Sequence, residues 1–351
     1  MDPVNVADYE ALAATRLEPG VLGYYAGGAG DERTLRDNVE AFARLRLRPR
    51  VLVDVSDVST ATTVLGSEVA MPILVAPTAL QRLAHPDGEP GMARAAAAAG
   101  TIFTLSTLAT SRPREVCEHA PPAPRWFQLY AFRDAAVTRA LCDEAVECGF
   151  DAIVLTADAP RAGRRERDLR TGFAVPPGVD MPAVRAALGT DACPTPAEFF
   201  SLVDASLTWA AVERLAGDLD LPVVVKGIQT AQDAALACEH GAAAIVVSNH
   251  GGRQLDGVAA SIDLLPEVVD AVGGRLEVLM DGGIRRGTDV AVALALGARA
   301  VLVGRPALWG LAASGEAGAR HVLELLRDEL HLALLLLGCP TPAHVTREHV
   351  S

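Results

Sequence analysis

Eight short apolar runs, each followed by polar or glycine-rich residues, recur along this chain of 351 residues. Each run is nearly continuously apolar, as a strand buried on both faces is. Alanine-rich segments of helical character, such as 91–99 and 288–296, lie between several runs. Eight such βα units predict an α/β fold, a (β/α)8 TIM barrel, which takes about 250 residues. The runs occupy residues 72–76, 102–105, 126–129, 152–155, 222–225, 244–247, 277–280 and 300–303.

The residues beyond those that a barrel needs fall mainly in two places. The first is the stretch 1–70, with helical patterns at 6–25 and 34–44. The second is the gap between the fourth and fifth runs, which is rich in Pro and Gly and is typical of a lid over an active site. We therefore predict a single domain over 1–351. It consists of an N-terminal helical segment (1–70), a barrel (71–310) with a lid loop (171–210), and C-terminal helices (311–351).

Charge and apolar content exclude several classes of protein. The chain has 44 acidic and 31 basic residues, a net charge of -13, which gives no attraction to nucleic acid or to an anionic membrane. The longest strongly apolar stretch, 330–339, is too short to span a bilayer. The six cysteines show no CxxC pair and no metal-ligand spacing. We therefore expect a cytoplasmic protein without a nucleic-acid partner, a membrane partner or a bound metal.

The residues after the last two runs predict a phosphate site. Active-site groups of a (β/α)8 barrel lie at the carboxyl ends of its strands. The seventh run is followed by DGGIRRG and the eighth by GRP. Glycines let backbone N–H groups approach an anion, and Arg285 and Arg305 add positive charge.

The residues after the sixth run predict a general base. His250 lies in SNHGGRQLDG, next to two glycines and three residues before Arg253. An imidazole can take a proton from a substrate, and the nearby guanidinium can bind a carboxylate through two hydrogen bonds. Asp158, after the fourth run, is the best-placed carboxylate to support the imidazolium. We interpret the other histidines as surface or core residues.

Several arginines follow the fourth run in TADAPRAGRRERD. Most are expected to be solvated or paired with acidic neighbours, but one could turn inward. The sequence alone leaves open which of Arg161, Arg164, Arg165 and Arg167 that is.

Seven segments together resemble the FMN-dependent 2-hydroxy-acid oxidase and dehydrogenase family, which includes glycolate, lactate and mandelate oxidases. The match runs in order from about residue 8 to residue 345. The resemblance implies an FMN-binding barrel that oxidises L-2-hydroxy acids to 2-oxo acids and returns the electrons to oxygen, a quinone or a cytochrome. It also implies a homo-oligomer, a tetramer or octamer. The segments are GYYAGGAGDERTL, APTALQRLAHPDGE, QLYAFRD, LTADAPRAGRRERD, VVVKGI, VVSNHGGRQLDG and DGGIRRGTDVAVALALGARAVLVGRP.

The resemblance also implies roles at the substrate. His250 would be the catalytic base, assisted by Asp158, whether the electrons leave as a hydride or through a carbanion. Tyr130 would hydrogen-bond the substrate oxygen. The substrate carboxylate would be bound by Arg253 and Arg165, the inner arginine of GRRE, with Tyr24 beside them.

The remaining roles implied by the resemblance concern FMN. The ring would rest on Pro77, Thr78 and Ala79 and contact Ser106, Gln128 and Thr156. The phosphate would contact Gly283, Arg285, Gly304 and Arg305 in the loops that include Gly282. Asp281 and Ser248 would lie near the ribityl chain and ring, and Lys226 at the N1 and C2 carbonyl edge.

Lys226 also stands out in the composition. It is the only lysine among the 31 basic residues, so the other 30 are arginines. A planar guanidinium with five donors is wider than an ammonium and would displace a ring that fits against Lys226. We therefore interpret position 226 as one where Arg cannot replace Lys.

Departures from the family pattern bear on substrate and acceptor. Leu108 replaces a tryptophan, and Ala162 a leucine or methionine, that are typical of glycolate-selecting members, so we expect a lactate-sized or larger substrate such as mandelate. Quinone-linked mandelate dehydrogenases of the family tend to have glycine in place of Ala79, so we expect oxygen as acceptor and hydrogen peroxide as product.

Three alternatives remain open at this point. The first is a dehydrogenase of the same family that passes electrons to a quinone or a cytochrome. The second is a Schiff-base aldolase with Lys226 as nucleophile. The third is a noncatalytic flavin-binding barrel.

Overall fold

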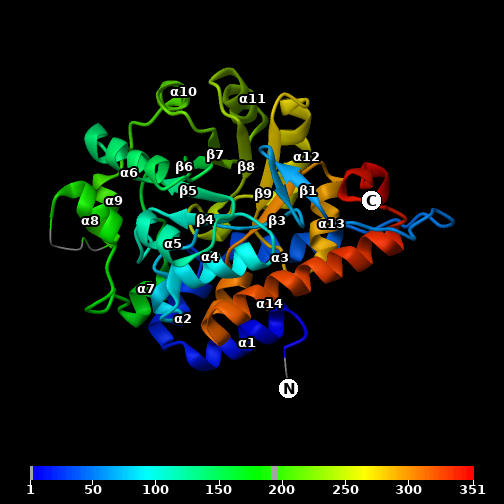
Figure 1. Cartoon of the computed structure of the whole chain (residues 1–351), viewed down its shortest axis with the longest axis horizontal. Helices are drawn as coiled ribbons and strands as arrows, with labels where there is room; N and C mark the ends of the chain where they lie inside the picture. Colours follow the sequence, from blue (N-terminus) through cyan, green and yellow to red (C-terminus); the bar gives the residue numbers. More distant parts are fainter. Residues whose placement is uncertain (1–2, 191–193, 195) are drawn as a thin grey trace.

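Eight parallel strands form a closed barrel at the centre of the protein (Figure 1). The computed structural model describes residues 3–190, 194 and 196–351. The strands follow one another around the barrel in chain order, and the last one pairs with the first. The predicted (β/α)8 barrel is therefore confirmed. Its strands are β3 (Ile73–Val75), β4 (Phe103–Ser106), β5 (Arg125–Leu129), β6 (Ala152–Thr156), β7 (Val223–Ile228), β8 (Ala244–Val247), β9 (Glu277–Asp281) and β10 (Ala300–Val303).

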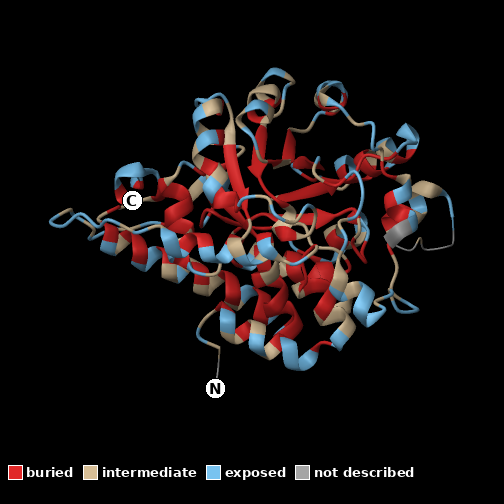
Figure 2. Cartoon of the chain, turned by 180° about the vertical axis from the view of Figure 1, so that it is seen from behind, coloured by how far each residue is buried: buried red, intermediate tan, exposed pale blue. Residues whose placement is uncertain are grey.

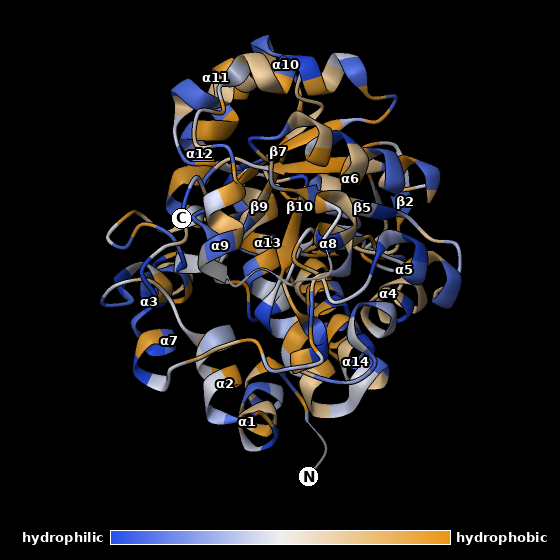
Figure 3. Ribbon diagram, turned by 90° about the vertical axis from the view of Figure 1, so that its left-hand side faces the viewer, coloured by the Kyte–Doolittle hydropathy of each residue, from blue (hydrophilic) through white to orange (hydrophobic). Residues whose placement is uncertain are grey.

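Both faces of these strands are buried, which explains their continuous apolar runs. Leu74, Trp126 and Val154 belong to the cluster that fills the barrel interior. Their neighbours Ile73 and Phe127 belong to the larger cluster between the barrel and its helices. Figures 2 and 3 show the strands as a buried, hydrophobic centre surrounded by more exposed helices.

A helix of seven or more residues follows each barrel strand. The last one, α14 (Arg305–Leu337), has non-helical backbone at Ser314 and Gly315. Its first part follows β10, and beyond this kink it continues as the C-terminal helix. The other helices are α4 (Gly88–Ala98), α5 (Pro113–His119), α6 (Ala135–Glu147), α10 (Trp209–Asp218), α11 (Ala231–Glu239), α12 (Ser261–Val272) and α13 (Gly287–Ala295).

The N-terminal segment differs from the expected pattern in two respects. The helical stretch expected at 6–25 is two helices, α1 (Val6–Arg16) and α2 (Pro19–Ala26), because Pro19 starts a helix but cannot continue one. Sequence analysis also missed a hairpin of β1 (Thr62–Val64) and β2 (Ser67–Val69), whose Val64 and Val69 join the barrel-interior cluster. The second expected helix is present as α3 (Arg33–Glu40) and the 3-10 turn η1 (Ala41–Arg44). Shorter 3-10 turns are η2 (Gln81–Leu83), η3 (His250–Gly252), η4 (Pro342–His344) and η5 (Arg347–His349).

Between β6 and β7 the chain forms α7 (Glu166–Thr171), α8 (Pro182–Leu188) and α9 (Pro196–Leu202). We call the segment 171–210 the lid segment. Its Phe173 ring stacks on Tyr24 at a centroid distance of 4.6 Å, and Phe199 and Phe200 make edge contacts with Tyr130. The lid segment is therefore packed against residues of the predicted site.

Three further observations concern the described residues only. None of their helices is long and apolar enough to cross a membrane. They contain no group of three His, Cys, Asp or Glu side chains that could hold a metal ion. Cys117, Cys142, Cys148, Cys238 and Cys339 are free thiols, and Cys193 lies outside the described residues.

Candidate active site

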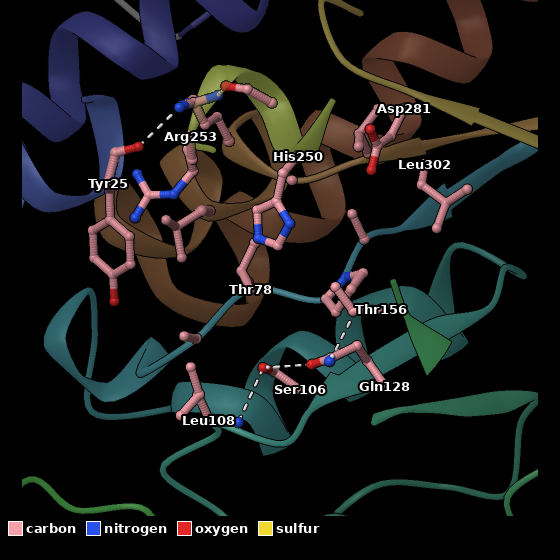
Figure 4. A pocket seen from close by; sticks show the side chains of 18 of the residues that line it. Tyr25, Thr78, Ser106, Leu108, Gln128, Thr156, His250, Arg253, Asp281 and Leu302 are labelled. Carbon is pink, nitrogen blue, oxygen red and sulfur yellow. Dashed lines mark hydrogen bonds between the residues drawn. The ribbon is translucent and has the colours of Figure 1, made fainter. Parts of the chain in front are cut away.

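One pocket at the carboxyl ends of the strands brings most of the predicted site residues together (Figure 4). Asp158 and Ser248 lie beside it, because they hydrogen-bond to His250 and Lys226 of its wall. The predicted residues that line the pocket are Tyr24, Pro77, Thr78, Ala79, Ser106, Leu108, Gln128, Tyr130, Thr156, Arg165, Lys226, His250, Arg253, Asp281, Gly282, Gly283, Arg285, Gly304 and Arg305.

Ala162 is the predicted residue that the structure does not bring to the pocket. Its side chain is exposed. The adjacent Gly163 packs directly on the backbone of Arg253 and Gln254, where an added Cβ would lie 2.2 Å from the Arg253 carbonyl oxygen. This close packing turns Ala162 toward solvent, so the placement gives no support to a role for Ala162 in substrate size.

His250 and Asp158 form a buried pair. Nδ1 of His250 lies 2.9 Å from Oδ1 of Asp158, and the two side chains are 20% and 6% exposed. Burial alone would raise the Asp158 pKa. The charges of His250 and Lys226 lower it by more than burial raises it, so the net pKa is below the usual value. Burial lowers the His250 pKa, and the Asp158 charge only partly offsets this. An ionised Asp158 therefore accepts a hydrogen bond from the Nδ1–H of His250, which leaves Nε2 unprotonated as the basic atom.

The backbone of His250 is held in an unusual conformation. Its φ is +59°, in the left-handed region that costs a non-glycine residue about 1–3 kcal/mol. The Ser248 hydroxyl accepts the His250 N–H at 3.0 Å, and the Asn249 side chain accepts the Gly252 N–H at 3.1 Å. These bonds fix the turn after β8 and aim the imidazole into the pocket.

Gly227 allows Asp158 to approach β7 closely. Gly227 lies at the irregularity in the β7–β8 register and has a φ of +111°. A Cβ added there would lie 2.6 Å from the Cβ of Asp158. In the sequence, the only signal for this role is a glycine next to Lys226.

We predict that Gly227→Ala displaces Asp158 and weakens the His250–Asp158 bond. Because the Asp158 charge raises the pKa of His250, its displacement should move the acid limb of the kcat profile to lower pH. The loss of the hydrogen bond that orients the base should lower kcat by about 10²-fold. A pH profile of kcat tests this prediction. An unchanged acid limb would contradict it, and Gly217→Ala, in an open position on α10, is the matched control.

Two buried guanidinium groups face the substrate end of the pocket. Nη1 of Arg253 donates to the carbonyl oxygens of Tyr24, at 2.6 Å, and Gly27, at 2.9 Å. Burial and the nearby Arg165 lower the Arg253 pKa to about 10. The Nε of Arg165 is buried without a hydrogen-bond partner among the described residues. Guanidinium groups with unused donors in a buried pocket are suited to bind a carboxylate.

The structure decides which arginine of GRRE and its neighbours turns inward. Arg165 lines the pocket and lies 5.9 Å from the centroid of the Tyr24 ring. Arg161 and Arg164 are exposed, and Arg167 pairs with Glu32 at 2.6 Å. Sequence reasoning could not make this choice, because the four arginines lie within seven residues of one another and all follow the same strand.

Tyr130 and the lid segment form an apolar wall at the same end. Burial raises the Tyr130 pKa, so its hydroxyl remains protonated and can donate a hydrogen bond. The lid segment contributes Val175, Met181 and Phe200, which sequence analysis did not single out. The only signal for them was their place in a segment predicted to cover the site. Further lining residues that were missed are Tyr25, Ala76, Leu80, Gly251, Ile284, Leu302, Val303, Pro306 and Leu308.

Lys226 lies in the pocket wall among polar groups. Its Nζ is 3.0 Å from Oδ2 of Asp281 and 2.9 Å from the Ser248 hydroxyl. Burial alone would lower its pKa, but the charges of Asp281 and Asp158 raise the net pKa above the usual value. Lys226 is therefore a fixed positive charge.

The loops after β9 and β10 form a site suited to a phosphate. Gly282 and Gly283 have consecutive positive φ values, +97° and +87°, a geometry that presents backbone N–H groups to an anion. Gly304 is the N-cap of α14, where the helix dipole favours negative charge. Arg285 and Arg305 line the same region, and burial lowers the pKa of both.

The residues present fit the expected FMN. Oδ1 of Asp281 is buried without a hydrogen-bond partner in the described chain, as expected of an acceptor that would bind a hydroxyl group of the cofactor. Gln128 bonds to the Ser106 and Thr156 hydroxyls at 3.1 and 3.0 Å, so amide and hydroxyl groups are present in the pocket wall for the polar edge of the ring. Ala76, Pro77 and Leu302 supply apolar surface for a flat ring.

Comparison with known proteins identifies the family of the chain. Residues 13–351 match the FMN-dependent dehydrogenase family. The chain is 51% identical over 346 residues to an L-lactate oxidase from Nostoc sp., covering 96% of this chain and 95% of the relative. It is 48% identical over 359 residues to a glycolate oxidase from Spinacia oleracea, covering 100% and 96%.

Solved structures of mandelate oxidase are similar over the whole fold. One with benzoyl-formic acid is 44% identical with a TM-score of 0.90, covering 100% of this chain and 98% of that chain. One with (S)-4-hydroxymandelic acid is 42% identical with a TM-score of 0.93, covering 99% and 98%.

The chain belongs to the FMN-dependent 2-hydroxy-acid oxidase and dehydrogenase family. The predictions of this family, of FMN as cofactor and of a 2-hydroxy-acid oxidase are confirmed at this level.

Proposed function

We propose that this protein oxidises an L-2-hydroxy acid, lactate-sized or larger, to the 2-oxo acid and passes the electrons to oxygen. The observation that carries the proposal is the His250–Asp158 pair, at 2.9 Å, in a pocket that also contains Arg253 and Arg165. A base next to two carboxylate-binding groups suits a substrate whose hydroxyl and carboxylate are on adjacent carbons.

His250 moves the proton in this proposal. Its Nδ1 is held by Asp158, so its Nε2 takes the substrate proton. The imidazolium that forms is stabilised by Asp158, whose low pKa keeps the carboxylate ionised. Because burial lowers the His250 pKa, the base form predominates at neutral pH.

Arg253, Arg165 and Tyr130 orient the substrate. The two guanidinium groups bind the carboxylate, and the protonated Tyr130 hydroxyl donates to a substrate oxygen. The apolar wall of Val175, Met181 and Phe200 contacts the substrate side chain and excludes water.

The chemistry that FMN would supply is the acceptance of two electrons from the substrate's α-carbon. Arg285, Arg305 and the glycines after β9 and β10 would hold its phosphate. Gln128, Thr156 and Ser106 would contact the polar edge of its ring, and the positive charge of Lys226 would stabilise negative charge on that ring.

Substrate size is tested by comparing kcat/KM for glycolate, L-lactate and (S)-mandelate. Leu108 lines the pocket at a position where glycolate-selecting members of the family typically have a tryptophan. The smaller leucine leaves room for a substrate side chain larger than the hydrogen of glycolate. We expect kcat/KM for L-lactate or (S)-mandelate to exceed that for glycolate by about fourfold or more, because each buried methylene contributes about 0.8 kcal/mol and the wall is apolar. A preference for glycolate would overturn this part of the proposal. Leu108→Trp should shift the ratio toward glycolate, and Leu255→Trp, at an exposed site, should not.

The acceptor is tested by product analysis. We expect one hydrogen peroxide for each 2-oxo acid in aerated buffer. Ala79 lines the pocket at the position where quinone-linked mandelate dehydrogenases of the family tend to have glycine. This difference supports oxygen as the electron acceptor. Peroxide well below stoichiometry, with faster turnover on a soluble quinone or cytochrome, would identify a dehydrogenase instead.

The geometry argues against the aldolase alternative. A Schiff-base lysine needs a neutral amine, which burial commonly provides by lowering its pKa. Here the Lys226 pKa is raised and its Nζ is paired with Asp281. Borohydride with a keto substrate should therefore leave Lys226 unmodified. The noncatalytic alternative is disfavoured because a barrel that only binds flavin does not need a histidine like His250, which is held in a strained backbone conformation and paired with a carboxylate.

We also propose a homo-oligomer and a reducing, cytoplasmic location. Val51 and Leu52, on a projecting loop, are 82% and 102% exposed, and Leu332 and Leu336 on α14 are 55% and 67% exposed (Figure 1). The backbone of this loop bonds α14 through Arg50 N–H and Leu337 O at 3.1 Å, so these apolar side chains share one region that a second copy can cover. The five free thiols support the location. Light scattering measures the oligomeric state, and Leu52→Glu should dissociate the oligomer.

A further inference from the structure

Two arginine side chains, Arg253 from the loop after β8 and Arg305 from the start of α14, donate to the carbonyl groups at the C-terminal end of α2. The last carbonyl groups of a helix lack partners within the helix and carry partial negative charge. Nη1 of Arg253 donates to the Tyr24 and Gly27 carbonyl oxygens at 2.6 and 2.9 Å. Arg305 donates from Nε to the Tyr25 carbonyl oxygen and from Nη2 to the Gly27 carbonyl oxygen, both at 2.9 Å. The Gly27 oxygen is thus shared by both guanidinium groups.

Arg305 also reaches the turn that carries the base. Its Nη1 donates to the carbonyl oxygen of Gly251, next to His250, at 3.0 Å. Arg305 is the first residue of α14 and lies beside Gly304 in the predicted phosphate region. One rigid, planar side chain therefore joins that region to α2 and to η3.

Arg305 keeps donors free for an anion while it makes these bonds. Of the five guanidinium N–H groups, three are used by Tyr25, Gly27 and Gly251, so two remain. Burial and the neighbouring charges of Arg253 and Arg285 lower its pKa well below the usual value. A phosphate at the free donors would offset this repulsion and hold the guanidinium in place.

The bonds of Arg305 bear on the substrate end because α2 carries Tyr24. The Tyr24 ring lies 5.1 Å from the Arg253 guanidinium and stacks on Phe173 of the lid segment. If the carbonyls of Tyr25 and Gly27 moved, both the Tyr24 ring and the acceptors of Arg253 would move with them. Substrate carboxylate binding therefore depends on a contact made from the phosphate region.

We propose that Arg305 is a positioning residue that couples occupation of the phosphate site to assembly of the substrate carboxylate site through the carbonyl groups at the end of α2. The inference rests on the proposed function, because it assigns the carboxylate site to Arg253 and Tyr24. It differs from a role in FMN binding alone, which any phosphate-binding arginine would fill.

Arg285 provides the matched comparison. It lines the same region, but its side chain donates only to the Ile284 carbonyl oxygen, at 3.0 Å, among the hydrogen bonds of the described residues. Loss of either guanidinium should weaken FMN binding. Only loss of the Arg305 guanidinium should loosen α2.

The test compares Arg305→Lys and Arg285→Lys as holoenzymes with saturating FMN. The probe is oxalate, a dicarboxylate without an α-hydrogen, titrated by its effect on flavin absorbance. We expect Arg305→Lys to raise the oxalate Kd at least tenfold and Arg285→Lys to change it less than twofold. Hydrogen exchange at the Gly27 and Ala29 amides, which donate to Gly23 and Gly252 oxygens, should quicken in Arg305→Lys only. Equal effects in both variants, or no effect of Arg305→Lys, would overturn the proposal.

A second measurement needs no variant. Wild-type protein loaded with riboflavin lacks only the phosphate, so we expect weaker oxalate binding and faster exchange at Gly27 and Ala29 than with FMN. Identical behaviour of the two flavins would overturn the coupling. If FMN-loaded wild type fails to oxidise any L-2-hydroxy acid, the proposed function fails, while the exchange comparison still decides whether the phosphate site and α2 are coupled.

Discussion

Replacing His250 by Asn should lower the rate of flavin reduction by L-2-hydroxy acids by about 10³-fold, within the range expected for loss of a general base. An amide cannot take up the substrate proton. Asn is the replacement of choice because the backbone here has a φ of +59°, which Asn tolerates better than other non-glycine residues. The protein should therefore fold and keep its FMN.

The measurement is anaerobic stopped-flow reduction of the bound flavin, with His331→Asn, at an exposed position of α14, as control. FMN content and the visible spectrum should match those of the wild type in both variants. A His250→Asn protein that is reduced at the wild-type rate would remove His250 from the mechanism. In the wild type the reduction rate should fall only below the usual histidine pKa, because burial lowers the pKa of His250 and the neutral form is the active one.

The barrel strands and the place of His250 in the pocket were predictable because their signals are local. Continuous apolar runs identify strands buried on both faces, and the residues after them are placed at one end of the barrel by topology. His250 needed no contact information for this reason. The β1–β2 hairpin has three residues in each strand, too few for an alternation of apolar and polar residues to appear.

The details that failed or were missed depend on contacts between distant segments. Arg165 differs from its neighbours only in where the loop after β6 turns. Ala162 faces solvent because Gly163 packs on the loop after β8, some 90 residues away in the sequence, as the Gly163–Gln254 hydrogen bond shows. Met181 and Phe200 reach the pocket through the fold of the lid segment. A sequence shows that these residues are apolar or basic, but tertiary packing decides which way each one points.

Replacing Lys226 by Arg should weaken FMN binding by about tenfold to a hundredfold. The ammonium group lies in a closed position, with the residue 4% exposed and its Nζ 3.0 Å from Asp281 and 2.9 Å from Ser248. A wider guanidinium must push against these partners or into the space of the ring. Overpacking of a buried site costs about 1–3 kcal/mol, and each 1.4 kcal/mol is tenfold in affinity.

The FMN Kd of the apoprotein, measured by quenching of flavin fluorescence, tests this prediction. Lys226→Met separates charge from size, because it has a similar length but leaves Asp281 without its cation. It should slow flavin reduction at saturating FMN, whereas Lys226→Arg keeps the charge and should act mainly on affinity. Arg320→Lys, at an exposed position of α14 paired with Glu324, is the control for the reverse exchange. If Lys226→Arg binds FMN as tightly as the wild type, the single lysine among 31 basic residues reflects composition rather than a requirement of the site.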